Sequence, residues 1–260
     1  MSRGTRRNKK KQDSQGLLLI FIAVVVVVSV GFVYFQSKSN EITRDKNTLC
    51  RNDGLVTVEH VVIIDSTDSF NNTQALIAKK ELNSLLDNSP QDSRFSLYVI
   101  NKNIADEKPL LELCNPGDGS DKNEFTSNKR RLLQKWKEGF HNKIINEIDL
   151  LIDANIADSS PIMETLKYAS INSFYGSKAQ KKKLILLSDL LQHSASYSHY
   201  NDTGNYDDFK SLNIANSLTP SLDNVDVEIL YLYRAKDSNR QNRKHITFWE
   251  HYLANAGGSL

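Results

Sequence analysis

Residues 61–69 read VVIIDSTDS, an aliphatic run that ends in a carboxylate and continues into two hydroxyl side chains on alternate residues. A continuous aliphatic run of this kind is typical of a strand buried on both faces, as in a parallel sheet covered by helices. In such sheets, ligands bind where the loops leave the carboxyl ends of the strands. The stretch therefore predicts a central strand followed by a loop in which Asp65, Thr67 and Ser69 offer hard oxygen ligands for Mg²⁺ or a similar cation.

Segments of strand and helix character alternate along the rest of the chain. Strand patterns occupy residues 56–64, 95–100, 110–113, 184–187 and 225–233, and helical spacing of apolar residues occupies 73–86, 128–152, 162–174, 209–218 and 246–256. This order predicts an α/β domain of three layers, Rossmann-like, with a mainly parallel central sheet between helices. Trp136 and Trp249 lie on helical segments and are expected in the core.

Two further polar positions stand where a loop meets a strand or a helix. Ser160 precedes Pro161 at the expected start of a helix, where its hydroxyl would cap the first turn. Asp189 ends the aliphatic pattern LILLSD of residues 184–189. Ser159 is an alternative to Ser160 as an oxygen donor, and Asp68 is expected to be a solvated turn residue. Each of these residues is also an ordinary turn or cap residue, which is the simpler interpretation of any one of them alone.

Taken together, the D-x-T-x-S turn, the Ser160 loop and Asp189 resemble the metal-ion-dependent adhesion site of von Willebrand factor type A (VWA) domains, over roughly residues 56–256. The resemblance implies that Thr67 and Ser69 coordinate the ion through their hydroxyls, and that Ser160 does so directly or through water. It implies that Asp65 and Asp189 bind mainly through water. One coordination position would then remain for a carboxylate from a partner protein.

The chain departs from the family pattern at three positions. Thr67 stands where the family has Ser and Ser160 where it has Thr, so both positions keep a hydroxyl. Leu190 follows Asp189 where the family commonly has Gly. The geometry of this last loop is therefore the point at which the resemblance is tested.

An apolar segment at residues 17–35 is long enough to span a bilayer as a helix. Six basic residues precede it: Arg3, Arg6, Arg7, Lys9, Lys10 and Lys11. This asymmetry predicts a cytoplasmic N-terminus, an inner or plasma membrane location, and a periplasmic or extracytoplasmic C-terminal part. A cleaved signal peptide is the competing interpretation, but the segment is longer than a usual h-region and no A-x-A-like site follows.

The expected organisation is a basic cytoplasmic tail at 1–16, a single transmembrane helix at 17–35, a tether at 36–54 and a VWA-like domain at 55–260. The chain has two cysteines, Cys50 and Cys114, both beyond the apolar segment. Without a C-x-x-C pair they cannot form a structural zinc site alone. In an oxidising compartment they would pair as a disulfide; the alternative is two unrelated buried thiols.

The expected function is a membrane-anchored binding module that holds a protein partner through Mg²⁺, or through Mn²⁺ or Ca²⁺, within a multi-protein envelope complex. No nucleic-acid partner is expected, and the chain is expected not to be an enzyme. The G-x-S-x-G, P-loop and H-E-x-x-H motifs are absent from the sequence. One alternative is a metal-dependent hydrolase on a similar sheet, although Thr67 stands where such enzymes usually have a second carboxylate. The other is a VWA-like structural domain without metal.

The loop at residues 192–208 is rich in tyrosine, serine and histidine. Its histidines, His193 and His199, have no metal-ligand spacing and are expected at the surface or rim of the site. Its tyrosines, Tyr197, Tyr200 and Tyr206, either pack the loop or form a recognition surface, of which loop packing is the simpler interpretation.

Overall fold

The computed structural model describes residues 4–39, 42–100, 108–124, 127–153, 157–201 and 204–260. The chain divides into two units, Met1–Thr43 and Arg44–Leu260. Helix α1 (Gly4–Ser39) belongs to the first unit. It contains Leu18–Gln36, a segment near the N-terminus that is long and apolar enough to cross a membrane.

Within the described residues, the second unit is built on one six-stranded sheet with the order β3-β2-β1-β4-β5-β6. The strands are β1 (Val58–Asp65), β2 (Arg94–Ile100), β3 (Leu111–Cys114), β4 (Lys181–Ser188), β5 (Val225–Tyr231) and β6 (Gly258–Ser259). All neighbouring pairs are parallel except β2 and β3, which are antiparallel. The predicted mainly parallel sheet is confirmed, with β1 at its centre.

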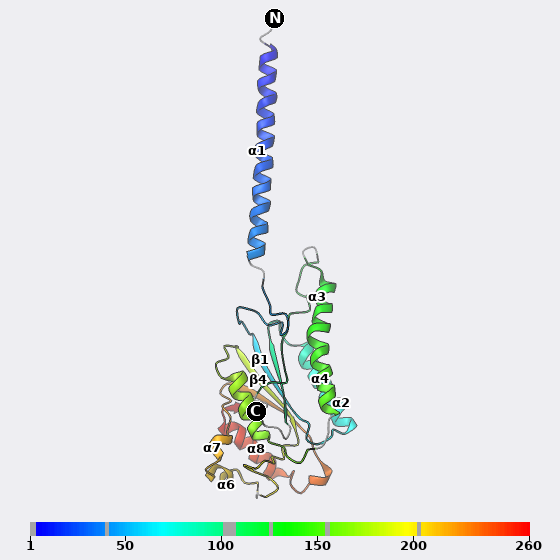
Figure 1. Ribbon diagram of the computed structural model, residues 1–260, viewed down its shortest axis with the longest axis vertical. Helices are drawn as coiled ribbons and strands as arrows, with labels where there is room; N and C mark the ends of the chain where they lie inside the picture. The colour runs from blue at the N-terminus through cyan, green and yellow to red at the C-terminus, as the bar shows by residue number, and fades with distance from the viewer. Residues whose placement is uncertain (1–3, 40–41, 101–107, 125–126, 154–156, 202–203) are drawn as a thin grey trace. The chain divides into compact units, whose positions relative to one another are not determined.

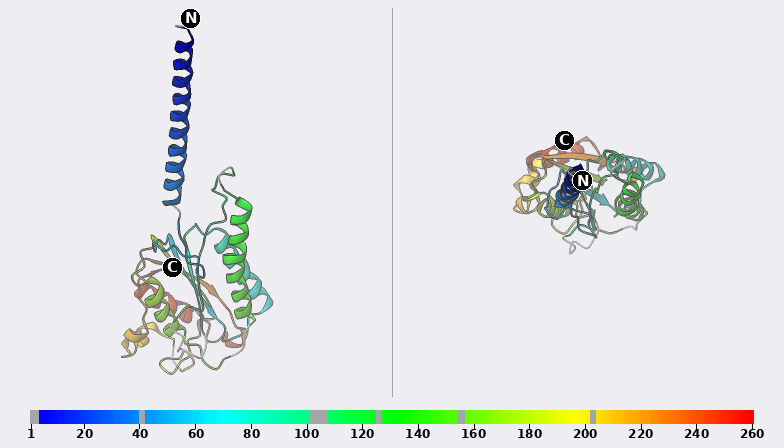
Figure 2. Two further views of the ribbon diagram at one scale, coloured as in Figure 1. Left: turned by 45° about the horizontal axis from the view of Figure 1, so that its top comes forward. Right: turned by 90° about the horizontal axis from the view of Figure 1, so that it is seen from above.

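Helices cover both faces of the sheet (Figure 1). One face packs against α2 (Asn72–Asp87), α3 (Lys129–Trp136), the π-helical turn η1 (Lys137–His141) and α4 (Asn142–Ile152). The other face packs against α5 (Ile162–Ala169), the π-helical turn η2 (Ser170–Phe174), α6 (Tyr206–Ser211), α7 (Ala215–Leu218) and α8 (Arg243–Asn255). Figure 2 shows the same two helical layers from other directions. The three-layer α/β prediction is confirmed.

Strand β1 is buried on both faces, because a layer of helices covers each face of the sheet. Successive side chains of the strand point to opposite sides and so enter different cores. Val61 and Ile63 enter the core beneath α5 and α8, whereas Val62 and Ile64 enter the core beneath α2 and α4. Trp136 and Trp249 are both in the core, as predicted. The last residue of the strand, Asp65, lies at the end of the sheet where the carboxyl ends of β1, β2 and β4 meet.

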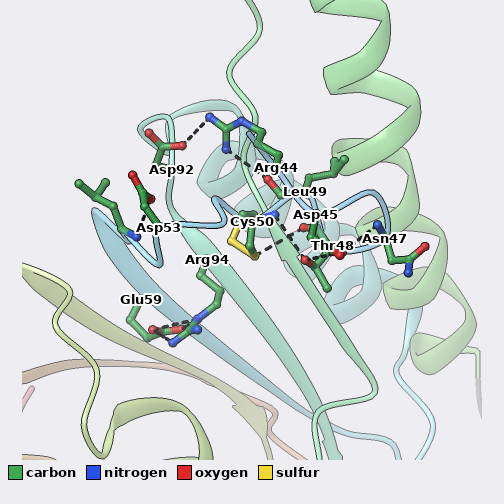
Figure 3. Close-up of a disulfide and its surroundings, with 12 residues drawn as sticks. Arg44, Asp45, Asn47, Thr48, Leu49, Cys50, Asp53, Glu59, Asp92 and Arg94 are labelled. Atoms are coloured by element: carbon green, nitrogen blue, oxygen red, sulfur yellow. Dashed lines mark hydrogen bonds and ion pairs between the residues drawn. A yellow bond between two sulfur atoms is a disulfide. The ribbon is translucent and has the colours of Figure 1, made fainter. Parts of the chain in front are cut away.

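The expected tether at 36–54 divides in the structure, because its second half packs on the second unit (Figure 3). Arg44 and Arg51 form a β-bridge with each other, and both pair with Asp92, at N–O distances of 2.5 and 3.4 Å. Leu49 is buried against the core beneath α3 and η1. Ion pairs and one apolar contact hold this segment, which is why no apolar periodicity reveals it.

Cys50 and Cys114 form a disulfide, as predicted for an oxidising compartment (Figure 3). The bond joins the segment before β1 to the end of β3, across a sequence separation of 64 residues. The backbone N–H of Cys114 also donates to the carbonyl of Thr48 at 2.8 Å. The N-terminal segment of the second unit is therefore attached covalently to the edge of the sheet.

His60 is a buried polar side chain inside β1 that the sequence analysis does not single out. Its ring stacks on Phe95 at a centroid distance of 4.4 Å, and neither ring nitrogen has a hydrogen-bond partner among the described residues. Burial lowers the pKa of His60 to about 4, and the charge of Lys183 acts in the same direction. The fold therefore favours the neutral imidazole of this histidine over the charged form.

Reducing the disulfide should lower the stability of the second unit. In the chain-entropy model, opening a loop of this length costs roughly 4 kcal/mol of the free energy of unfolding. We expect the Cys50→Ala/Cys114→Ala variant to show this loss in urea denaturation, with the fold retained in circular dichroism. An unchanged denaturation midpoint would show that the disulfide adds nothing.

His60 should make the second unit sensitive to acid. The pKa of His60 is about 4 in the folded state against an ordinary value of 6.5, so the unfolded chain binds a proton between these values that the folded chain does not. The contribution of His60 to the free energy of unfolding is complete above pH 6.5. About 3 kcal/mol of this free energy is lost as the pH falls from 6.5 to 4. The measurement is urea denaturation of the wild type and of His60→Phe across this range. Relative to the wild type, His60→Phe should gain about 3 kcal/mol in the free energy of unfolding as the pH falls from 6.5 to 4, and a difference that stays constant with pH would contradict the assignment.

Candidate metal centre

The carboxylate of Asp65 is buried at the carboxyl end of β1 and accepts hydrogen bonds from three surrounding loops or strands. Its Oδ1 accepts from the backbone N–H of Thr67 at 3.1 Å and from the Thr67 hydroxyl at 2.6 Å. Its Oδ2 accepts from the hydroxyls of Ser160 at 3.2 Å and Ser188 at 2.6 Å. These bonds join the loop after β1, the loop before α5 and the end of β4 at one carboxylate.

The direction of these bonds matters for cation binding. An ionised carboxylate can only accept hydrogen bonds, so each of the three hydroxyls must donate its single proton to Asp65. The lone pairs of Thr67 and Ser160 then remain available to a cation, whereas Ser188 Oγ already accepts from the backbone N–H of Leu190 at 2.8 Å. Among the described residues, no group of three or more His, Cys, Asp or Glu side chains is placed to hold a metal ion. A cation at this centre would therefore depend on hydroxyl oxygens, which suit Mg²⁺ and similar hard ions.

Asp189 adds a second buried carboxylate beside the first. It follows β4 directly, and its Oδ1 accepts from the backbone N–H of Leu191 at 2.9 Å. Burial, together with the neighbouring charge of Asp65, raises the pKa of Asp189 to about 7. Burial also raises the pKa of Asp65, while its hydroxyl donors oppose the shift. Two desolvated carboxylates that repel each other form a centre that a positive charge would stabilise.

The structure brings four of the five predicted ligands to this centre. Thr67 and Ser160 contact Asp65 directly, and Asp189 lies close enough for the two carboxylates to interact. Ser69 differs, because its side chain is exposed and its hydroxyl makes no hydrogen bond within the described chain. The role of the five predicted residues as metal ligands stays a prediction. Of the two alternative serines, Ser160 and not Ser159 contacts the carboxylate.

The expectation that Ser160 caps the following helix is wrong. Helix α5 has Pro161 at its N-cap position with no side-chain hydrogen bond, because the Ser160 hydroxyl donates to Asp65 instead. Gln192 takes over the helix end: its side-chain oxygen accepts from the backbone N–H of Met163 at 2.9 Å. The amide of Gln192, which is fully buried, also donates to Glu164 at 2.9 Å.

Ser160 is also fixed through its backbone. Its N–H donates to the carbonyl of His193 at 2.8 Å, and the N–H of His193 donates back to the carbonyl of Ser160 at 2.9 Å. The N–H of Ala157 donates to the carbonyl of Thr67 at 2.9 Å. The loop before α5 is thus bonded on one side to the loop after β1 and on the other to the loop after β4.

Leu190, at the position where VWA domains commonly have Gly, adopts a left-handed backbone conformation with φ 61°. This conformation costs a residue with a Cβ atom about 1–2 kcal/mol. The Leu190 carbonyl accepts from the indole N–H of Trp249 at 2.8 Å and lies 2.9 Å from Nε2 of His245. The side chain of Leu190 is buried in the core. Core packing and these carbonyl contacts therefore hold the turn in a conformation that Gly adopts without strain.

Two residues at the centre were missed by the sequence analysis, Ser188 and Arg234. Ser188 is fully buried and donates to Asp65; its place at the end of the strand, directly before Asp189, is the signal that could have revealed it. Arg234 lies just beyond β5, and its Nε is 3.5 Å from Oδ2 of Asp189. Since β5 runs parallel to β4, its exit lies at the same edge of the sheet, but the sequence alone does not place the two strands side by side.

The rim residues agree with expectation only in part. Asp68 is a partly exposed residue of the loop, and its carboxylate pairs with Lys236 at 2.9 Å. His199 is buried among aromatic rings and not at the surface, whereas Tyr197 and Tyr206 pack in the core, as loop packing predicts. Tyr200 is 40% exposed and carries the Arg240 guanidinium over its ring, at 4.6 Å from the centroid. Of the three tyrosines, Tyr200 is therefore the one whose side chain is exposed.

No protein-family model matches the chain, and no curated protein matches it. Solved structures are similar over part of it. One is the three N-terminal domains of the type V pili tip protein Mfa5 from Porphyromonas gingivalis, at 18% identity and a TM-score of 0.29, covering 53% of this chain and 20% of that one. The chain thus spans about a fifth of that structure.

Two further similar structures come from Bacteroides. An aerotolerance-related membrane protein from Bacteroides fragilis has 13% identity and a TM-score of 0.33, covering 77% of this chain and 88% of that one. The conserved hypothetical protein BatB from Bacteroides thetaiotaomicron has 12% identity and a TM-score of 0.28, covering 68% of this chain and 66% of that one. All three TM-scores lie below 0.5, so the chemistry of the centre rests on this chain's own residues.

Removing the Ser188 hydroxyl should destabilise the second unit. Ser188→Ala deletes a short, buried hydrogen bond to the Asp65 carboxylate and should cost about 2 kcal/mol of the free energy of unfolding. Ser159→Ala is the matched control, because Ser159 makes no bond to Asp65, and it should change stability by less than about 0.5 kcal/mol. Equal effects of the two substitutions in urea denaturation would contradict the described geometry.

Proposed function

We propose that this chain is a membrane-anchored, divalent-cation-dependent protein-binding module with a VWA-type adhesion site, and not an enzyme. Thr67, Ser69 and Ser160 would hold the ion through hydroxyl oxygens, with Asp65 and Asp189 acting mainly through water. The ion would be Mg²⁺, or Mn²⁺ or Ca²⁺, and would attract a carboxylate from a partner protein. With few anionic ligands of its own, such an ion keeps much of its charge for that carboxylate.

One observation carries this proposal: hydroxyls from the loop after β1 and the loop before α5 converge on the single buried carboxylate of Asp65. Burying a polar group costs free energy, so a carboxylate surrounded by hydroxyl donors inside a core is unusual where the role is purely structural. A second buried carboxylate, Asp189, lies near enough for the charge of Asp65 to raise its pKa.

The proposed location follows from α1 and the sequence around it. The basic residues before the apolar segment favour a cytoplasmic N-terminus, which would place the second unit in the periplasm or outside the cell. The Cys50–Cys114 disulfide supports this side of the membrane, because disulfides persist in oxidising compartments. A role within a multi-protein envelope complex fits an anchored binding module.

A structural domain that uses no metal is the second candidate, and one observation favours it. The guanidinium of Arg234 already lies beside Asp189 and supplies positive charge to the centre. The hydrolase alternative gains no such support, because Thr67 donates to Asp65 and offers no second carboxylate.

The proposed function is tested by Asp65→Asn in the full-length chain, purified in detergent. The substitution removes the charge on which the hydroxyls converge, so we expect Mg²⁺ and Mn²⁺ affinity in calorimetry to fall at least tenfold. Capture of a membrane partner should become as weak as that of the wild type in chelator.

Asp68→Asn is the matched control for Asp65→Asn. It removes a carboxylate three residues further along the same loop, but one that pairs with Lys236 at the rim. We expect its cation affinity to stay within about threefold of the wild type. If Asp65→Asn binds the ions as tightly as the wild type, the adhesion-site assignment is wrong.

A further inference from the structure

Arg234 occupies the edge of the sheet at which β1 and β4 end. It lies three residues beyond β5, whose last residue, Tyr231, pairs with Ser188 of β4. The Arg234 side chain is only 10% exposed, which is low for a side chain that always carries a charge. Such a residue requires partners that compensate for its burial.

The Arg234 guanidinium contacts the loop after β1. One terminal nitrogen donates to the carbonyl of Ser69, and the other donates to the carbonyl of Asp68 at 3.3 Å. Its Nε lies 3.5 Å from Oδ2 of Asp189 and has no hydrogen-bond partner among the described residues. Arg234 therefore holds the loop by hydrogen bonds, and acts on Asp189 by charge.

Among the described basic residues near the centre, Arg234 is the one that brings a buried positive charge next to Asp189. Asp65 and Asp189 are buried, and the three donors to Asp65 are neutral hydroxyls. Lys236, the next basic residue along the chain, pairs with Asp68 and its side chain is 65% exposed. Arg240 pairs with Asp237. Two buried like charges next to one buried opposite charge make each charge depend strongly on the others.

We propose that Arg234 is the built-in counter-ion of the Asp65–Asp189 centre, and that it sets the affinity of the centre for a divalent cation by competing for the same carboxylates. This inference rests on the proposed function for its ligand, but it can hold even if the native chain never binds a metal. The centre would then exist in two states. In one the guanidinium is its only positive charge, and in the other a divalent cation is bound as well.

Competition follows from the arrangement of charges. A divalent ion bound beside Asp189 would lie close to the guanidinium and repel it in a site of low dielectric constant. Binding must therefore overcome this repulsion or move the guanidinium away from Asp189. Because the same guanidinium holds Ser69 and Asp68 through their carbonyls, its movement would also loosen the loop that carries Thr67 and Ser69. Arg234 thereby links cation binding to the order of the loop.

The test compares the wild type with Arg234→Gln in the full-length chain, using Mn²⁺ and Mg²⁺ as probes in calorimetry. Glutamine removes the charge but keeps an amide donor for the loop carbonyls. We expect the dissociation constants to fall by roughly tenfold or more. Lys236→Gln is the matched control, since it removes a neighbouring positive charge at the surface, and should stay within about threefold of the wild type.

Thermal unfolding gives a second readout that does not depend on a partner. In chelator, Arg234→Gln should melt at a lower temperature than the wild type, because its two buried carboxylates have lost their counter-ion. Saturating Mg²⁺ should close this gap. Arg234→Lys keeps the charge without the planar fork, and its cation affinity should remain close to that of the wild type.

The outcomes separate this inference from the proposed function. Ion binding by Arg234→Gln but not by the wild type supports the inference and overturns cation-dependent adhesion by the native chain. Equal binding by the two overturns the inference and leaves the proposed function standing, whereas binding by neither overturns both. If Arg234→Lys gains affinity as Arg234→Gln does, loop geometry and not charge sets the affinity, and the inference is wrong.

Discussion

The buried carboxylate of Asp65 is the constraint around which the second unit is organised. A carboxylate at the end of a central strand, cut off from solvent, is tolerated only when donors surround it. Thr67, Ser160 and Ser188 supply them, and they come from segments far apart in the sequence. Satisfying one charged group therefore joins the loop after β1, the loop before α5 and the end of β4.

The loops around this carboxylate are themselves held by unusual means. The left-handed backbone of Leu190 is stabilised by its buried side chain and by the donors that surround its carbonyl. Gln192 takes the place of a conventional helix cap, and the bridge between Ser160 and His193 joins two loops directly. A left-handed residue and several buried polar side chains thus lie close to the Asp65 carboxylate, at the kind of position where functional sites are often found.

Much of this fold could be predicted from local patterns, because the aliphatic composition of β1 and the helical spacing of apolar residues indicate these elements directly. The aliphatic run before Asp65 predicts the central strand, and Ser160 and Asp189 are found from their positions at element ends. Long-range contacts escape such reasoning. The acceptor to which the Ser160 hydroxyl donates, and the place of Arg234 beside Asp189, depend on which strands become neighbours. Residues 44–54 are held by ion pairs and a disulfide and carry no apolar periodicity, so the sequence predicts only a tether there.

The disulfide has a mechanical consequence. Any tension that enters the second unit along the backbone from residue 43 reaches Cys50 before it reaches β1. At Cys50 the covalent path branches, and part of the load passes through Cys114 into β3 and on to its neighbour β2. Adjacent strands thus share a pull that would otherwise draw on β1 alone, so the strand that ends at Asp65 is shielded from being peeled out of the sheet.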